Sequence, residues 1–281
     1  MKAPKILLFL CVALCFATSC KKKEVDMTVV QKTVLENNTL SQIHVTDGWE
    51  VTIVHDSLSF VVLEYSAYLE NYIAVREVNN WLSIGFTGKV YAETGSVYRA
   101  TVHTNEMEFL SVRAENENVI SMKGSFVLTE GIDMELINAS VCSEFTIAAP
   151  SCSILLTNDS QLLNAVYTGT NCSVLATKRS SCKGFFNVEQ SFNANVQIGA
   201  QLIVFDGTMP SATLQVGDEG TINMVRVEVD NMEVHLDGAS EATVNVTNTL
   251  SGFVLEASTL YYKGQPQIEV ECSEDSQLIP F

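Results

Sequence analysis

Basic residues are scarce in this sequence: 16 Lys and Arg stand against 33 Asp and Glu, which gives a formal net charge of −17. Because phosphate binding needs a basic face, this deficit argues against a nucleic-acid partner. It also argues against docking on anionic lipid by charge alone. Charged residues make up only 17% of the chain and the mean hydropathy is positive, at +0.18. This composition excludes a wholly disordered chain.

Proline is also rare, with five residues, and no segment shows a convincing helical period. Short segments of alternating apolar and polar residues recur instead, as in 49–54 and 82–86, between clusters of Asn, Asp, Gly and Ser. Alternation of this kind is typical of strands with one buried face. The sequence therefore predicts an all-β protein.

Long hydrophobic runs are absent except at the N-terminus, where Lys2 and Lys5 form a short positive segment before the apolar run 6–17. This run is shorter than the about 20 residues that span a bilayer, and it is typical of a secretory signal peptide. Ala17, Thr18 and Ser19 then lead into Cys20, which resembles the lipobox of bacterial lipoproteins. We predict a lipoprotein signal peptide at 1–19, lipidation of Cys20, and a flexible tether over 20–38. The protein would then be anchored by lipid to the outer membrane of the cell envelope, on its periplasmic or its surface face.

The middle of the chain repeats every twenty residues from residue 132 onward. Apolar residues recur at three alternate positions, small residues at a fourth, and Cys, Leu, Ile or Ala at a fifth. A period of this kind without insertions predicts a solenoid. The columns are Ile132, Cys152, Cys172, Phe192, Ala212, Met232, Gly252; then Met134, Ile154, Val174, Ala194, Leu214, Val234, Val254; then Leu136, Leu156, Ala176, Val196, Val216, Leu236, broken at Glu256; then Ser140, Ser160, Ser180, Ala200, Gly220, Ser240; then Cys142, Leu162, Cys182, Leu202, Ile222, Ala242.

We predict a single-stranded, right-handed parallel β-helix of about 20 residues per coil, because stacked coils pair each strand with its copies about 4.8 Å above and below. The β-helix is assigned to 107–265, with a longer first step of 22 residues from Leu110 to Ile132. Residues 39–106 do not fit the period and are predicted to form an N-terminal β cap. Residues 266–281 are predicted to be a C-terminal cap or tail. A leucine-rich repeat has a similar period, but its signature is absent.

Cysteines are informative mainly through their placement in these columns. Cys152 and Cys172 occupy one inward column in neighbouring coils, so they form the one pair spaced for a disulfide; Cys142 and Cys182 are two coils apart, too far to bond. We expect buried, mostly reduced thiols. No C-x-x-C pair occurs, and no histidine lies close to a cysteine in the sequence. A zinc site is therefore not predicted, and no cofactor is implied.

The chain also resembles a known family. The motifs are the lipoprotein signal, the opening Gln42-Ile43-His44-Val45 with Trp49-Glu50-Val51-Thr52-Ile53, and the closing Leu260-Tyr261-Tyr262-Lys263-Gly264-Gln265-Pro266. They resemble the "putative auto-transporter adhesin, head GIN domain" family over roughly residues 40–265. The resemblance implies a secreted lipoprotein of unknown function with parallel β-helix repeats, and it carries over no catalytic residues. Ser and Ala stand here where the family commonly has glycine.

Catalytic motifs are missing: the sequence has no G-x-S-x-G, H-E-x-x-H, Walker or dinucleotide-binding signature. His55 and Asp56 are adjacent, so on a strand they would point to opposite faces. Asp218 and Asp237 fall at nearly equivalent places in successive coils, and they are the candidate ligand or metal surface; the alternative is a pair of solvated turn residues. Four aromatic residues form either a sugar-stacking surface or the core of the cap: Trp49, Trp81, Tyr91 and Tyr98.

Three functions therefore remain open. The first is a non-enzymatic envelope lipoprotein whose surface serves adhesion or assembly with an extracellular protein or glycan. The second is a glycan-active β-helix enzyme, a polysaccharide lyase or hydrolase. The third is a structural or sensory periplasmic module. The first is favoured, because the sequence offers a scaffold and a tether but no catalytic set.

Overall fold

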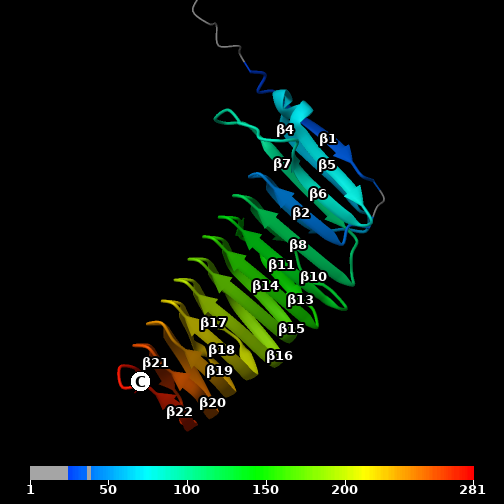
Figure 1. Cartoon of the computed structure of the whole chain (residues 1–281). Helices are drawn as coiled ribbons and strands as arrows, with labels where there is room; N and C mark the ends of the chain where they lie inside the picture. Colours follow the sequence, from blue (N-terminus) through cyan, green and yellow to red (C-terminus); the bar gives the residue numbers. More distant parts are fainter. Residues whose placement is uncertain (1–24, 37–38) are drawn as a thin grey trace, which may run out of the picture.

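The computed structural model describes residues 25–36 and 39–281. Parallel coils stack into an elongated β-solenoid of about 9 turns with roughly 20 residues per coil, which confirms the predicted fold class (Figure 1). The elements are β1 (Val29–Val34), β2 (Gln42–Thr46), β3 (Glu50–His55), β4 (Phe60–Ser66), the 3-10 turn η1 (Ala67–Tyr72), β5 (Ile73–Val78), β6 (Trp81–Phe86), β7 (Tyr98–Thr104), β8 (Phe109–Glu115), β9 (Val119–Lys123), β10 (Phe126–Val127), β11 (Gly131–Ile137), β12 (Val141–Cys142), β13 (Phe145–Ala148), β14 (Ser151–Thr157), β15 (Gln161–Thr177), β16 (Ser181–Gln197), β17 (Gln201–Asp206), β18 (Thr208–Gly217), β19 (Thr221–Leu236), β20 (Glu241–Val254), β21 (Thr259–Lys263), β22 (Gln267–Cys272) and β23 (Gln277–Pro280).

The predicted columns point inward and pair in the predicted register. Ile132 lies beside Cys152, Cys152 beside Cys172, and the 20-residue step continues through Met232. Each member of this column is at most 3% exposed. The longer first step is confirmed as well, since Leu110 pairs with Ile132. The core is therefore a set of apolar ladders that run along the axis of the solenoid.

The last part of the repeat differs from the prediction, because the coil after Met232 has two residues fewer. Met232 pairs with Leu250 rather than Gly252, and Leu236 pairs with Val254 rather than Glu256. The register shifts in the pairing of β19 with β20 lie between Asn223 and Asn231, just before the part of β19 that contains Met232. The predicted break at Glu256 was therefore a register error, and Val254 fills the inward place, fully buried.

Most corners after the first strand of a coil contain two successive residues with positive φ, and from Ser140 to Ser240 the small-residue column follows them. Asn138 and Ala139 have φ of 55° and 60°, and Asn158 and Asp159 have 56° and 64°. The next residue, Ser160 in this coil, is fully buried and donates its hydroxyl to the Thr157 carbonyl at 2.8 Å. Ser, Ala or Gly occupies this position from Ser140 to Ser240, whereas the first coil places Asn118 there, fully buried, with its amide donating to the carbonyls of Val45 and Glu115.

The N-terminal region does not stack in sequence order. β2 pairs in parallel with both β6 and β8, and β3 pairs in parallel with both β7 and β9. The coil of β6 and β7 is therefore outermost, although β2 and β3 precede it in the chain. The antiparallel strands β4 and β5 pair with β7 and β6 and cover this end (Figure 1). The range 39–106, predicted as a cap, thus contains two parallel coils besides the antiparallel cover.

The predicted tether and tail also contain strands that the sequence prediction missed. Within 20–38, β1 pairs antiparallel with β4, because the alternating Val30 and Val34 pack against the core. At the other end, β22 and β23 pair in parallel with β20 and β21, so coil stacking continues to residue 280. The predicted signal peptide and Cys20 lie outside the described residues. Among the described residues, no helix has the length and apolar character needed to cross a membrane.

Candidate functional site

The two predicted carboxylates lie near each other but not in one column. Asp237 lies against Gly217, whereas Asp218 lies beside Gly238, where a Cβ would be 3.2 Å from the Asp218 carboxylate. Both aspartates are exposed. Within the described residues, no group of three or more His, Cys, Asp or Glu is placed to hold a metal ion. The pair is therefore an open surface feature at a coil corner.

The adjacent His55 and Asp56 do not act together, because Asp56 turns to another histidine. Its Oδ2 is 2.9 Å from His103 Nδ1, and this hydrogen bond holds the pKa of Asp56 below its ordinary value. His103 stacks on the Phe60 ring with 4.0 Å between centroids. The nearby Ser57 hydroxyl donates to Asp56 rather than to the imidazole. The nucleophile-to-base contact of a catalytic triad is therefore not assembled here.

The cysteines are placed as the columns predicted. Cys142, Cys152, Cys172 and Cys182 are buried free thiols, and Cys272 is an exposed free thiol. Burial raises the pKa of Cys142 to about 12 and raises that of Cys172 well above its ordinary value. A thiol with a raised pKa is a poor nucleophile and metal ligand, so these residues serve as core side chains.

The four aromatic residues divide between the core and the surface. Trp49 is fully buried and packs on Phe86 and Tyr98, with ring centroids 5.4 and 6.0 Å apart. Trp81 is half exposed, beside His44 on the face of the sheet. Tyr91 is 79% exposed on the loop between β6 and β7. Phe86, Tyr98 and Tyr91 all line one cleft, so the buried Trp49 supports its aromatic wall.

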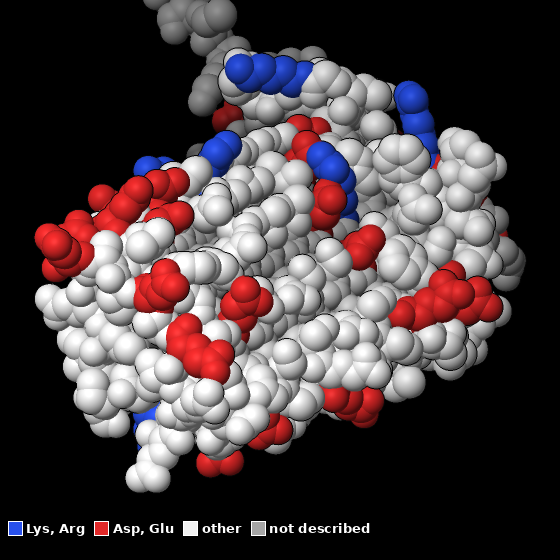
Figure 2. Space-filling view, turned by 60° about the horizontal axis from the view of Figure 1, so that its bottom comes forward, with Lys and Arg blue, Asp and Glu red and all other residues white. Residues whose placement is uncertain are grey.

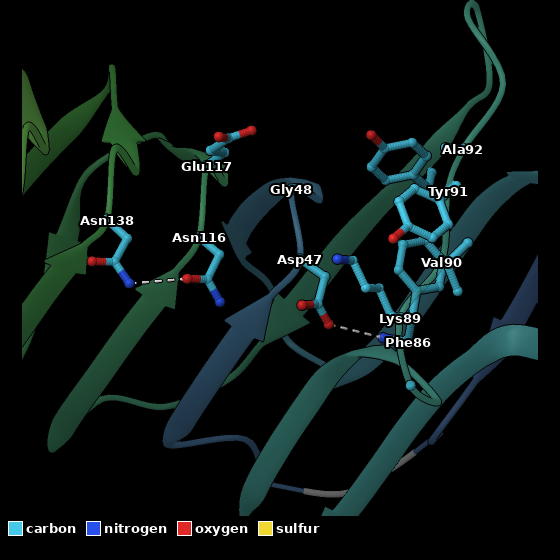
Figure 3. A pocket seen from close by; sticks show the side chains of 12 residues that line it. Asp47, Gly48, Phe86, Lys89, Val90, Tyr91, Ala92, Asn116, Glu117 and Asn138 are labelled. Carbon is cyan, nitrogen blue, oxygen red and sulfur yellow. Dashed lines mark hydrogen bonds between the residues drawn. The ribbon is translucent and has the colours of Figure 1, made fainter.

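This cleft has a volume of about 500 Å³ and lies between the loop 87–97 and the first corners of the solenoid (Figure 3). The corner wall carries Asp47, Asn116, Glu117 and Asn138, and the loop wall carries Lys89 and Tyr91. Figure 3 shows Lys89 extending from the loop side toward Asp47. The Lys89 ammonium lies 5.1 Å from the centroid of the Tyr91 ring. We call this feature the corner cleft.

Hydrogen bonds fix both walls of the corner cleft. Asn138 Nδ2 donates to Asn116 Oδ1 at 2.9 Å, and Asn158 Nδ2 donates to Asn138 Oδ1 at 2.7 Å, which makes an amide ladder along three coils. Asp47 Oδ2 accepts from Thr46 Oγ1 at 2.9 Å and from the Phe86 backbone N–H at 3.4 Å. The ladder could have been anticipated from the Asn that opens each of the three corners.

A second feature is the outer face of the sheet in the middle of the solenoid. The ranges 151–157, 171–177, 191–197 and 211–217, which stack on one another, contain no charged residue. Their outward side chains are mainly Ser, Thr, Asn and Gln. Acidic side chains gather in separate groups on the face shown in Figure 2, with broad uncharged areas between them. We call the four ranges the uncharged face.

Two shallow hollows adjoin on this side of the molecule. One, of about 260 Å³, is lined by Ser173, Leu175, Asn193, Asn195, Thr213 and Gln215 among others. The other, of about 210 Å³, shares Thr213 and reaches Glu233 and Ser251 on the following coils. Such an extended shallow surface suits a polymer or a protein better than a small molecule.

The architecture and surface define a capped parallel β-solenoid with an extended uncharged face, on which the described residues assemble no catalytic triad. Residues 39–266 match the model of the family described as "Putative auto-transporter adhesin, head GIN domain". The chain belongs to this family, as its opening and closing motifs implied. A comparison with curated proteins finds no match.

Solved structures show the same fold. A putative adhesin from Parabacteroides merdae is 13% identical, with a TM-score of 0.61, over 90% of this chain and 96% of that one. A protein from Parabacteroides distasonis described as a "putative lipid binding protein" is 11% identical, with a TM-score of 0.63, over 92% of this chain and 98% of that one. A putative adhesin from the same organism is 14% identical, with a TM-score of 0.60, over 91% and 98%. At these identities the likeness concerns the fold alone.

Proposed function

We propose that this protein is a non-enzymatic lipoprotein of the cell envelope that presents its solenoid surface for adhesion or assembly with an extracellular protein or glycan. The observation that carries the proposal is the uncharged face. In a chain with a net charge of −17, four stacked coils keep one side free of charge. Such a side can approach a partner without the desolvation cost of buried charges.

The proposal is supported by the chemistry of the remaining surface. The Asp56 and His103 pair has no nucleophile placed on the imidazole, and Asp218 and Asp237 stand open to solvent. Membership of a family named for adhesins agrees with a binding role. A glycan-active enzyme remains the alternative with a distinct signature, since it would release reducing ends or unsaturated sugars from polysaccharides.

The test is adhesion of bacteria that display the full chain, scored on layers of host cells and on immobilised envelope polysaccharides. Asn193→Asp places one charge on the uncharged face, and Asn187→Asp places the same charge on another exposed side of the same strand, β16. We expect adhesion to fall at least severalfold for Asn193→Asp and to stay unchanged for Asn187→Asp. Equal adhesion of both variants, or polysaccharide depolymerisation by the unchanged protein, would overturn the proposal.

The anchor is proposed from the sequence around Cys20. Cys20→Ser should abolish lipidation and move the protein from the detergent-extracted membrane fraction to the soluble fraction, because a lipid chain then no longer holds it. Ser19→Ala is the matched control, since it keeps both the cysteine and a small residue before it. If Cys20→Ser still requires detergent for extraction, another attachment holds the protein.

A further inference from the structure

We propose that the corner cleft is a binding site for a neutral pyranose unit of a glycan chain. This inference deepens the proposed function, on which it rests, by naming the class of partner and the place where one sugar ring is held. The cleft lies on coil corners, apart from the uncharged face, so the two surfaces can be tested separately.

The aromatic wall supplies a flat apolar platform. Tyr91 is 79% exposed, and a tyrosine ring left in solvent keeps a large apolar face available for contact. Axial C–H groups give a pyranose ring an apolar face of matching size, and these two surfaces stack. In the same wall, Phe86 and Tyr98 pack edge to face with ring centroids 5.5 Å apart. This part of the cleft is therefore rigid before a ligand arrives.

The opposite wall supplies a donor and an acceptor for sugar hydroxyl groups. Asn116 ends the amide ladder: its Oδ1 accepts from Asn138, and its Nδ2 has no hydrogen-bond partner within the described part of the chain. Amide chains polarise along their length, so a donor at the end of such a ladder is strengthened. Asp47 uses Oδ2 for the Phe86 backbone and leaves Oδ1 as an acceptor at the cleft. Adjacent hydroxyls of a sugar both donate and accept, which fits this pair.

The charges around the cleft favour a neutral ligand. Asp47 and Glu117 on one wall repel carboxylate or sulfate groups, and the net charge of −17 adds to this repulsion at long range. Lys89, held over the Tyr91 ring at 5.1 Å, repels a cationic side chain from the same platform. A charged ligand therefore meets a group of its own sign in the cleft whichever sign it carries, whereas an uncharged sugar meets no such repulsion.

The size of the cleft sets the length of glycan that it holds. A volume of about 500 Å³ falls within the range of about 300–1,000 Å³ typical of small-ligand sites. It holds one or two rings, and the open ends let a longer chain continue outward. We therefore expect recognition of a short internal or terminal segment rather than of a whole polymer repeat.

The test measures binding of the full chain, extracted in detergent, to immobilised neutral hexasaccharides of glucose, mannose, galactose and N-acetylglucosamine, beside hexamers of galacturonate and a poly-lysine peptide. We expect at least one neutral series to bind and the two charged probes not to bind. Tyr91→Ala and Asn116→Asp should each weaken this binding at least tenfold. Tyr72→Ala is the control, because Tyr72 is an exposed tyrosine, at 47%, outside the cleft.

The outcomes separate this inference from the broader function. If Tyr91→Ala binds neutral glycans as well as the unchanged protein does, or if only a charged probe binds, the inference is wrong while adhesion through the uncharged face stands. Absence of binding to every neutral series also overturns it. If Asn193→Asp leaves cell adhesion unchanged, the proposed function fails, whereas the inference about the corner cleft is decided by the glycan binding of Tyr91→Ala. Equal circular dichroism spectra and melting temperatures of the variants are required before binding is compared.

Discussion

At the residue scale, alternation in the sequence determines which side chains enter the core of this solenoid. Leu156 is fully buried between Leu136 and Ala176, and Thr157, the next residue, is partly exposed. The same alternation explains why this acidic protein buries no charged side chain in the core of its described part, where the acids occupy outward and corner positions. A change of one position in the register would therefore exchange the environments of neighbouring residues.

Leu156→Asp tests this register against Thr157→Asp. The first substitution places an unpaired carboxylate between coils and should lower the free energy of unfolding by several kcal/mol. The second adds the same group at the surface and should change stability by less than about 1 kcal/mol. Urea unfolding followed by circular dichroism measures both. Equal midpoints for the two variants would contradict the inward assignment of Leu156.

The Asp159 and Arg179 pair gives a prediction on pH. Arg179 donates two hydrogen bonds to the Asp159 carboxylate, at 2.8 and 2.9 Å, which lower the pKa of Asp159 from its ordinary value of 3.8. Because the folded state lowers this pKa, the ionised pair stabilises the fold at any pH above the ordinary pKa. That stabilisation is lost as the pH falls through the folded-state pKa, so the loss occurs below about pH 4. Carboxyl NMR titration should show Asp159 returning to its ordinary pKa in Arg179→Gln and staying lowered in Arg99→Gln. A pKa unaffected by Arg179→Gln would exclude the pairing in solution.

At the element scale, the corner residues determine features of the coil that the twenty-residue period alone does not predict. Pairs of residues with positive φ, such as Asn158 and Asp159, occur in coil after coil with few glycines among them. Asn and Asp tolerate this conformation better than other residues with a side chain. The signal of two such residues before the small column is complete only in Asn158-Asp159-Ser160; the next corner uses Lys178 and Arg179, so the small residue that follows is the more regular mark of a corner. Repeated in one place, Asn also builds the ladder that ends at the corner cleft.

Asn138→Gly and Asn138→Ala separate the ladder from the backbone conformation. Both remove two side-chain hydrogen bonds, to Asn116 and from Asn158, which should lower the free energy of unfolding by about 1 kcal/mol. Ala at a φ of 55° adds strain of about 1 kcal/mol that Gly avoids. We expect the order unchanged protein, Gly variant, Ala variant in urea midpoints. A Gly variant as stable as the unchanged protein would show that the ladder contributes nothing.

At the scale of the whole molecule, the regular part of the solenoid could be predicted and the ends could not. The ladder from Ile132 to Met232 follows from spacing, because each coil pairs with its sequence neighbours. The insertion of β2 between β6 and β8, and of β3 between β7 and β9, depends on contacts between segments far apart in the chain, which a sequence period does not reveal. The shortened coil at Leu250 was not predicted, because a fixed step of twenty residues also places Gly252 and Val254 in the inward columns. Likewise, Tyr91 and Asp47 meet at the corner cleft only through this crossed order.

The ends of the solenoid should differ in their local stability. The N-terminal coil of β6 and β7 is covered by antiparallel strands, whereas β22 and β23 pair with a coil on one side only among the described residues. Stability in a solenoid is a sum over neighbouring coils, so a coil with one neighbour opens most readily. We expect amide hydrogen exchange to be fastest in β22 and β23, slower in β6 and β7, and slowest in β14 to β16. Leu260→Ala removes a fully buried side chain in β21 and should accelerate exchange in β21 to β23 severalfold while leaving β6 and β7 unchanged. A uniform rate across all strands, accelerated equally by Leu260→Ala, would mean instead that the solenoid opens as one cooperative unit.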